Sequence, residues 1–371
     1  MVGDNSTAGA LDGILVADFS RVLAGPYATM MLADMGAEVV KVERPGAGDD
    51  TRHWGPPYGP DGQATYFAGV NRNKRSVSID LHSEEGLARA KELAAKADVV
   101  VQNFRPGVME RLGLDYATVA ASNPGVVYAS LSGFGTSPEG ASLGGYDLVV
   151  QAVGGMMSVT GQDADHPVKV GVAVIDVLTG LHLGMGILTA LYHRTATGLG
   201  QHVETDLMSC SLASLVNQSA AYAGAGTVAK PLGNRHPSIA PYEVFRTAAG
   251  ELAVAAGNDS LYRRFCGVLE LPELVDDPRF RTNPERVAHR DELIPVIEER
   301  LATRTADEWF ELLRKVGVPA GPVNDMAGAF SFAERLGLDP VVDVEGSRSV
   351  RNPVRMSATP ATYRSPAPRL N

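Results

Sequence analysis

One acidic residue lies alone in an apolar stretch of the chain. Asp176 is the only Asp or Glu between Asp165 and Glu204, and it lies where a strand-like apolar run ends and an apolar helix begins near Val177. An Asp at such a junction commonly caps the helix N-terminus. The same position suits a nucleophile or a general acid/base, because an apolar surround and a helix N-terminus set its pKa and reactivity. Spacing alone leaves both interpretations open.

A second group of polar residues ends an apolar run at 101–107. The sequence there is Val-Gln-Asn-Phe-Arg-Pro-Gly, a predicted strand that ends in Asn103, Phe104 and Arg105 before a Pro-Gly turn. The carboxyl ends of parallel strands border the ligand crevice of an open α/β sheet. Arg105 and the nearby Arg111 would meet phosphates there through charge-assisted hydrogen bonds. A turn with ordinary surface arginines explains the same pattern, so both interpretations stay open.

Other polar clusters carry weaker signals. Arg-Asn-Lys-Arg at 72–75 is either a solvated loop or a patch that docks phosphates. His53 and His236 lie among turn residues, with no second His or Cys at metal-ligand spacing. Cys210 and Cys266 are far apart in the sequence and form no CxxC pair. We therefore expect no metal site and no disulfide framework.

Strand-like and helix-like segments alternate along the first third of the chain. Such alternation indicates βαβ crossovers and a mainly parallel sheet, so we predict the α/β class. The first βα turn, at 18–26, contains no GxGxxG, and no Walker, HExxH or GxSxG pattern occurs in the sequence, which disfavours nicotinamide, flavin, NTPase, zincin and hydrolase sites. The predicted strands are 14–19, 38–43, 77–81, 98–104 and 126–131, and the predicted helices are 26–35 and 83–96, the latter with Ser83 as N-cap.

A smaller unit with a different pattern follows. Residues 242–247 and 251–256 flank an Ala-Gly turn and predict a β-hairpin. A Thr305…Glu308 capping box predicts the start of a helix. The predicted helices are 259–269, 284–302 and 306–316, followed by turn residues at 317–322 and a Pro-rich, irregular remainder.

The expected organisation has three parts. A large domain covers 11–224 and includes a long core helix. A small α+β domain covers 225–325, and a C-terminal tail over 326–371 returns to the large domain.

Charge and composition limit the function classes. The chain carries 33 Lys and Arg against 43 Asp and Glu, a formal net charge of −10. This disfavours a general nucleic-acid partner, because binding of that kind depends on Lys and Arg that neutralise phosphates. A hydrophobic fraction of 44% excludes bulk disorder. Residues 112–250 hold only five basic and nine acidic residues, so we expect burial of this stretch in its own core or under a partner chain.

The apolar segments predict a cytoplasmic protein. The longest run, 177–192, is shorter than the roughly 20 residues that span a membrane and contains His182. It predicts a buried core helix, and we expect no membrane partner. Residues 1–10 lack the basic and apolar regions of a signal peptide, so we expect a frayed leader there and a location in the reducing cytoplasm.

Six segments, in this order along the chain, resemble motifs of the family III CoA-transferases. That family includes formyl-CoA transferase, carnitine CoA-transferase and the α-methylacyl-CoA racemases. The segments extend over nearly the whole chain, which makes the resemblance specific. They are Leu-Ala-Gly-Pro at 23–26, Asp-Met-Gly-Ala-Glu-Val-Val-Lys-Val-Glu-Arg-Pro at 34–45, Asn-Arg-Asn-Lys-Arg-Ser at 71–76, Asn-Phe-Arg-Pro-Gly at 103–107, Gly-Tyr-Asp at 145–147 and Gly-Ile-Leu-Thr-Ala-Leu at 186–191.

The resemblance implies an architecture and a nucleophile. It implies a large Rossmann-like domain, a smaller domain, and two chains threaded through one another as an interlocked homodimer. Asp176 falls on the family's catalytic aspartate, whose carboxylate attacks a donor acyl-CoA to give an aspartyl mixed anhydride and then an aspartyl-CoA thioester. The acceptor acid takes the CoA by the same steps in reverse. Backbone amides at Gly154 and Gly155 are candidates for holding the oxyanion.

The resemblance also implies the substrate contacts. The CoA thioester is a substrate, and no permanently bound cofactor is expected. Family members often have Lys three places after Ile79, where this chain has His82. The residues that the motifs assign to CoA binding are Arg21, Val22, Ala24, Arg44, Ile79, Asn103, Phe104, Arg105 and Arg111.

Tyr146 bears on which activity of the family is expected. Racemases have a histidine at this position, where it transfers protons. A phenol with a pKa of about 10 is a poorer base at neutral pH than an imidazole at about 6.5. Transfer to a carboxylic acid is therefore favoured over an α-methylacyl-CoA racemase or epimerase. A non-catalytic acyl-CoA-binding protein is the other alternative.

Two segments bear on the acceptor acid. Residues 46–52 and 233–242 look like the branch of the family that uses succinyl-CoA and dicarboxylic acids such as glutarate. The distal carboxylate of such an acceptor needs a binding group. Arg52, Arg235 or His236 is expected to supply it.

Overall fold

The chain folds into two compact units. A computed structural model describes residues 9–371, so the expected leader lies outside the described residues except for Gly9 and Ala10. Unit 1 comprises 9–157, 169–228 and 339–371, and unit 2 comprises 158–168 and 229–338. The first boundary thus lies at 228, close to the expected 224, whereas unit 2 extends to 338 rather than 325 and also includes the segment 158–168.

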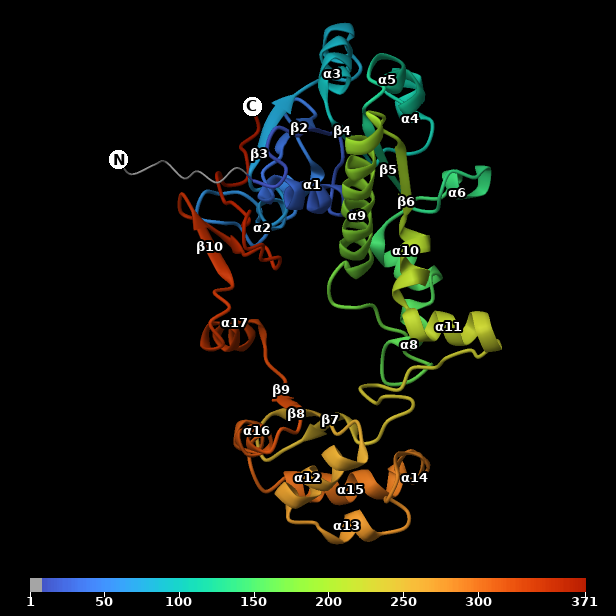
Figure 1. Ribbon diagram of the computed structural model, residues 1–371, viewed down its shortest axis with the longest axis vertical. Coiled ribbons are helices and arrows are strands. Elements are labelled where there is room, and N and C mark those ends of the chain that lie inside the picture. The colour runs from blue at the N-terminus through green and yellow to red at the C-terminus, as the bar shows by residue number, and fades with distance from the viewer. Residues whose placement is uncertain (1–8) are drawn as a thin grey trace. The chain divides into compact units, whose positions relative to one another are not determined.

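Unit 1 is built on a six-stranded parallel sheet with the strand order β3-β2-β1-β4-β5-β6 (Figure 1). This is the strand order of doubly wound, Rossmann-type sheets, in which the order reverses between β1 and β4 and the ligand crevice opens there. The predicted α/β class with a parallel sheet is confirmed. The strands are β1 (Leu15–Asp18), β2 (Glu38–Glu43), β3 (Lys74–Ser78), β4 (Val99–Gln102), β5 (Val127–Ser132) and β6 (His202–Asp206).

The two edge strands are where the sequence prediction was wrong. β3 covers 74–78 rather than 77–81, and β6 was not predicted. An edge strand pairs on one side only and tolerates polar residues, so its pattern departs from a buried apolar run. The Lys-Arg-Ser start of β3 and the polar β6 therefore lacked the signal that identified the four inner strands.

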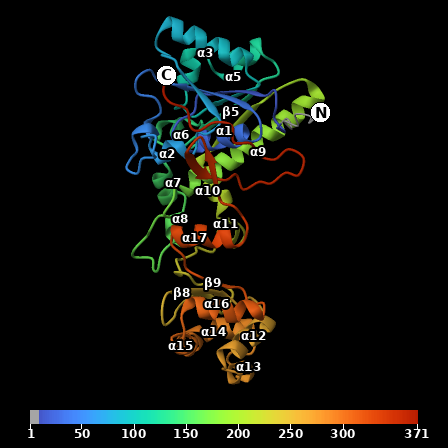
Figure 2. The ribbon, with the colours of Figure 1, turned by 90° about the vertical axis from the view of Figure 1, so that its left-hand side faces the viewer.

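Helices cover both faces of the sheet. α1 and α9 pack on one face, and α3 and α5 pack on the other (Figure 2). The predicted cap of α3 is confirmed, because the Ser83 hydroxyl accepts the Gly86 amide at 3.0 Å. The helices up to residue 225 are α1 (Ala24–Asp34), the 3₁₀ turn η1 (Asp50–His53), α2 (Thr65–Ala68), α3 (Glu84–Lys96), α4 (Val108–Leu112), α5 (Tyr116–Ser122), α6 (Pro138–Ser142), α7 (Asp147–Val153), α8 (Met156–Val159), α9 (Val174–Thr197), α10 (Leu207–Ser214) and α11 (Val216–Ala225).

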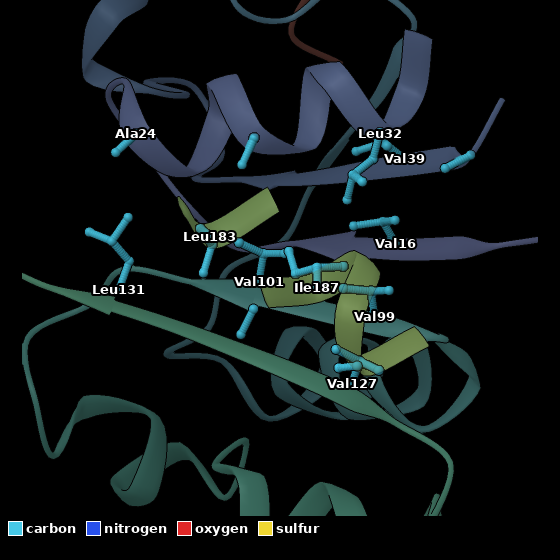
Figure 3. Packing of buried hydrophobic residues seen from close by; sticks show 14 of the residues in the cluster. Val16, Ala24, Leu32, Val39, Val99, Val101, Val127, Leu131, Leu183 and Ile187 are labelled. Carbon is cyan, nitrogen blue, oxygen red and sulfur yellow. The ribbon is translucent and has the colours of Figure 1, made fainter. Parts of the chain in front are cut away.

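Helix α9 contains the apolar run that predicted a buried core helix, but it is longer than that run and only one of its faces is buried. Its Leu183 and Ile187 are buried against Val99 and Val101 of β4 and their neighbours (Figure 3). Among residues 9–371, α9 is long and apolar enough to cross a membrane by length and composition alone. Core helices pass the same test, and the buried face of α9 forms part of the unit 1 core.

Residues 339–371 of the expected C-terminal tail belong to unit 1, and they are more regular than expected. It forms an antiparallel hairpin of β10 (Val341–Val344) and β11 (Ser347–Val350). Further along, the Arg364 guanidinium donates to the carbonyls of Ala33, Gly36 and Ala37 at 2.9–3.1 Å. These bonds satisfy carbonyls at the C-terminal end of α1 and just beyond it.

The basic cluster at 72–75 is part of this structural frame. Arg72 makes a two-pronged ion pair with Asp34 at 2.6 and 2.9 Å, and both side chains are buried. The Lys74 ammonium lies 3.1 Å from the Asp18 carboxylate, also buried. Because Arg72 and Lys74 are buried and paired inside the protein, both interpretations of this cluster are wrong for them: they form neither a solvated loop nor a patch that docks phosphates.

Unit 2 has the expected α+β composition. The predicted hairpin and the Thr305…Glu308 capping box are confirmed. The helix expected over 284–302 is two helices that meet at His289, and the turn-rich 317–322 ends in a third strand. The elements are β7 (Tyr242–Arg246), β8 (Glu251–Ala255), α12 (Asp259–Leu269), α13 (Glu273–Asp276), α14 (Asn283–Ala288), α15 (Arg290–Leu301), α16 (Ala306–Lys315), β9 (Ala320–Pro322) and α17 (Met326–Arg335).

Candidate active site

Two adjoining clefts open at the carboxyl ends of the central strands of unit 1. The first, which we call the Asp176 cleft, has a volume of about 180 Å³. The second, the Arg44 cleft, has a volume of about 520 Å³. Arg21 and Phe104 line both clefts. The Asp176 cleft brings together Arg21, Val22, Ala24, Asn103, Phe104, Arg105, Tyr146 and Asp176, and the Arg44 cleft brings together Arg21, Arg44, Ile79, His82 and Phe104.

The turn after β1 is held in a strained conformation. Val22 has φ +71°, a left-handed conformation that β-branched residues rarely adopt. Its amide donates to the Asp49 carboxylate at 3.3 Å. Asp49 in turn pairs with the Lys41 ammonium at 2.9 Å, and both side chains are fully buried. Burial opposes the charge on Asp49, but Lys41 and two bonds from Thr51 outweigh it and lower the pKa of Asp49.

Asn103 joins the loop after β4 to the same turn. Its side-chain oxygen accepts the Arg21 amide at 2.9 Å, and its side-chain nitrogen donates to the Arg21 carbonyl at 2.7 Å. The Arg21 guanidinium lies over the Phe104 ring, 5.1 Å from its centre. Asn103 therefore holds two edges of the cleft together through its amide group.

Two arginines at the clefts share one carboxylate. Asp50 lies 2.5 Å from the Arg44 guanidinium and 3.9 Å from that of Arg21. All three side chains are partly exposed to solvent. An anionic ligand that bound both arginines would compete with Asp50 for them.

Asp176 does not cap helix α9. The N-cap position is Ala173, and Asp176 lies in the first helical turn. The amides of Ile175 and Asp176 donate instead to Asp147 of α7, at 2.8 and 3.3 Å. The simplest structural explanation for Asp176 is therefore wrong, because another carboxylate fills the capping role.

The Asp176 carboxyl has an unusual ionisation equilibrium. Burial, and then the nearby Asp147 carboxylate, raise its pKa to about 7. Burial and the charge of Asp176 also raise the pKa of Tyr66, on α2, to about 12. A carboxylate made more basic in this way is a better nucleophile once ionised.

Three residues near this site were not predicted from the sequence. Asp147 and Gln151 lie one turn apart on α7, and Tyr66 lies on α2. The isolation of Asp147 in the charge-poor stretch 112–250 is the same signal that identified Asp176. Tyr66 has no such signal in the sequence.

Several expected site residues have other partners. The Arg52 guanidinium is locked in a two-pronged ion pair with Glu43, at 2.6 and 2.7 Å, and lies over the Phe67 ring. The Gly154 amide donates to the Val150 carbonyl at 2.7 Å and closes α7. Arg52 is therefore a structural residue in this conformation, and the Gly154 amide is already used. Gly155 and Arg111 are not among the residues that line either cleft.

The remaining acceptor candidates belong to unit 2. The Arg235 guanidinium lies 3.7 Å from Glu243 and 3.8 Å from Asp291. The His236 ring accepts the Ser238 amide at 3.1 Å. Among residues 9–371, no three His, Cys, Asp or Glu side chains are grouped as a metal site would require.

The doubly wound sheet and the clefts at its carboxyl edge define an α/β protein of the Rossmann type, a class in which ligands bind at that edge. The chain belongs to CoA-transferase family III: the model of that family matches residues 11–371. The resemblance seen in the sequence is thus confirmed, and the protein is an enzyme that uses CoA thioesters as substrates.

Known relatives cover nearly all of the chain. Succinate–glutarate CoA-transferase of Agrobacterium fabrum is 41% identical, over 97% of this chain and 92% of the relative. Human succinyl-CoA:glutarate CoA-transferase is 40% identical, over 97% and 83%. The crystal structure of a CAIB/BAIF family protein from Brucella suis aligns with a TM-score of 0.90 at 40% identity, covering 98% of this chain and 97% of that one.

Proposed function

We propose that the protein moves CoA from succinyl-CoA to a dicarboxylic acid through covalent intermediates on Asp176. The observation that carries the proposal is the Asp176 carboxyl, with a pKa near 7, in a cleft also lined by Arg21 and Arg105. The names of the relatives support the substrate class, because those enzymes are succinyl-CoA:dicarboxylate transferases.

The reaction balances without an outside proton donor. The Asp176 carboxylate attacks the thioester carbonyl, and the C–S bond breaks. CoA departs as its thiolate, and the succinyl group stays on Asp176 as a mixed anhydride. The thiolate then attacks the aspartyl carbonyl and releases succinate, which leaves an aspartyl-CoA thioester. The acceptor carboxylate attacks that thioester, and the thiolate finally takes the acceptor's acyl group and frees Asp176.

The larger Arg44 cleft is the proposed seat of the adenosine and phosphate part of CoA. Its lining offers the apolar Ile79 and the cationic Arg44, both of which suit a nucleotide. Arg21 and Phe104 line both clefts, so one CoA molecule extends from the Arg44 cleft toward Asp176 in this proposal.

Hydroxylamine trapping tests the covalent step. Incubation with succinyl-CoA and hydroxylamine is expected to convert Asp176 to a hydroxamate, which intact-protein and peptide mass spectrometry detect. Asp176→Ala is expected to give neither the adduct nor turnover. Turnover by Asp176→Ala at the wild-type rate would overturn the mechanism.

A matched pair of acceptors tests the substrate class. Glutarate and pentanoate have the same five-carbon chain and differ only in the distal carboxylate. With succinyl-CoA as donor, we expect kcat/KM for glutarate to exceed that for pentanoate by about 100-fold or more, as for a charged group that meets a charged partner. Equal values would rule out a dicarboxylate preference.

We also propose a cytoplasmic homodimer. The outer side of α9 exposes Leu181, Met185, Leu188 and Tyr192, which recur every three or four residues and form one apolar face. A second copy of the chain is the proposed cover. Analytical ultracentrifugation is expected to give twice the chain mass, and Met185→Glu is expected to weaken the dimer; a monomer at micromolar concentration would contradict the proposal.

A further inference from the structure

Asp147 is a buried acid that the catalytic steps above do not use. Its side chain accepts three hydrogen bonds. One carboxylate oxygen accepts the amides of Ile175 and Asp176, at 2.8 and 3.3 Å. The other accepts the Gln151 side-chain amide at 2.6 Å. Asp147 thus supplies capping hydrogen bonds to a helix to which it does not belong.

Gln151 extends this contact to the segment that leads into α9. Its side-chain oxygen accepts the Val170 amide at 2.8 Å, and its side-chain nitrogen lies 3.4 Å from the Val172 carbonyl. Gln151 is fully buried, and it follows Asp147 by one helical turn. Together these two side chains fix the backbone on both sides of residue 173, three residues before Asp176.

We propose that Asp147 is a positioning residue for Asp176: its side chain holds the backbone amide of Asp176, and its negative charge acts on the Asp176 carboxyl. The role rests on the proposed function, because it assumes that Asp176 is the nucleophile. The hydrogen bonds fix the first turn of α9 and therefore the direction of the Asp176 side chain. The negative charge makes ionised Asp176 more basic.

The electrostatic part of this role has a known direction. A like charge nearby disfavours ionisation, and Asp147 contributes after burial to the raised pKa of Asp176. Loss of the Asp147 charge lowers that pKa and leaves the burial effect in place. The other charged or titratable groups that line the Asp176 cleft or interact with Asp176 are Arg21, Asp50, Arg105, Tyr146 and Tyr66.

Two substitutions at one position separate the two effects. Asp147→Asn removes the charge and keeps an oxygen that can accept the α9 amides. Asp147→Ala removes both. The readout is the rate at which succinyl-CoA acylates Asp176, followed by hydroxylamine trapping across pH. For D147N we expect the acid limb, the part of the pH–rate profile where the acylation rate falls as the pH is lowered, to move down by about one pH unit. For D147A we expect a rate loss of about 10- to 100-fold at saturating donor, with KM within about twofold.

Asp115→Asn is the matched control. Asp115 caps α5 by accepting the Thr118 amide at 3.1 Å, and it lines neither cleft. Asn keeps an oxygen that can cap α5, so the melting temperature, the acid limb and the acylation rate of D115N are all expected to stay close to those of the wild type. A merely structural role for Asp147 predicts the same behaviour for D147N, so that result would overturn the proposal.

If D147A does not fold, a second variant supplies the test. Gln151→Met keeps the Asp147 charge but removes the Gln151 amide that donates to the Asp147 carboxylate. We therefore expect slower acylation of Asp176 with the acid limb unmoved. Acylation at the wild-type rate in Q151M would overturn the positioning role alone. A wild-type enzyme that forms no adduct on Asp176 would instead overturn the proposed function.

Discussion

Gly180 of α9 lies directly against the backbone of Ala24, the first residue of α1. A Cβ atom at Gly180 would lie 2.6 Å from the Ala24 carbonyl oxygen. Asp176 is one turn before Gly180, on the same side of α9. The close approach of these two helices therefore brings Asp176 to the turn that carries Arg21 and Val22, with which it lines one cleft.

Gly180→Ala is expected to destabilise the fold and to lower the catalytic rate. The new methyl group meets backbone that cannot move aside, and such overpacking costs about 1–3 kcal/mol. Because α9 would shift away from α1, we expect kcat/KM to fall about 10-fold or more. Urea unfolding and steady-state kinetics measure the two effects.

Gly184→Ala is the matched control in the same helix. A Cβ atom there meets nothing within 4 Å. Alanine is the better helix former, so G184A is expected to leave stability unchanged or raise it by up to about 1 kcal/mol. Equal losses in G180A and G184A would show that close packing at Gly180 is not the cause.

The rate of donor acylation is expected to follow the ionisation of Asp176. Below about pH 7 the carboxyl is protonated and cannot attack, so kcat/KM for succinyl-CoA falls with pH on that side. The acid limb should give an apparent pKa near 7. A profile that stays flat down to about pH 5 would show that the free enzyme holds Asp176 ionised, as an ordinary exposed Asp is.

Asp176→Asn is expected to stabilise the fold at alkaline pH. The folded-state pKa, about 7, lies above the ordinary value of 3.8, so ionisation costs stability as pH rises from about 4 and costs it fully above 7. Asn removes that cost. We expect D176N to melt about 2 °C or more above the wild type near pH 8.

Near pH 4 the same comparison is expected to give a much smaller gain, because Asp176 is then protonated in the folded state and only about half ionised in the unfolded state. The difference between the two pH values isolates the ionisation from other effects of the substitution. A gain of equal size at both would assign it to packing.

Asp50→Asn is expected to improve the binding of the donor. Asp50 pairs with Arg21 and Arg44, and in the proposed binding mode a phosphorylated substrate must displace it. Exposed pairs are weak, so we expect KM for succinyl-CoA to fall by roughly two- to fivefold with kcat unchanged. Glu38→Gln, which breaks the exposed pair with Arg75, should leave KM alone. A rise in KM for D50N would assign Asp50 a direct part in binding.

The inner frame of unit 1 was predictable from local pattern. Apolar runs such as 98–104 and 126–131 identified inner strands, and Ser83 marked a helix start. The isolation of Asp176 among apolar residues identified the central carboxyl. The edge strands β3 and β6 were placed wrongly or missed, because half of an edge strand's environment is polar.

The sequence by itself determined the family, the positions of the inner strands along the chain and the chemical type of the candidate nucleophile, because these depend on short-range pattern and motif order. Only the tertiary structure decided which charged groups are free. Arg52 is bound to Glu43, and Asp147 rather than Asp176 caps α9. The partners in these contacts lie 9 and 28 residues apart in the sequence, beyond the range of local pattern. The pKa of a carboxyl likewise depends on burial and on charges that only folding brings within a few ångströms.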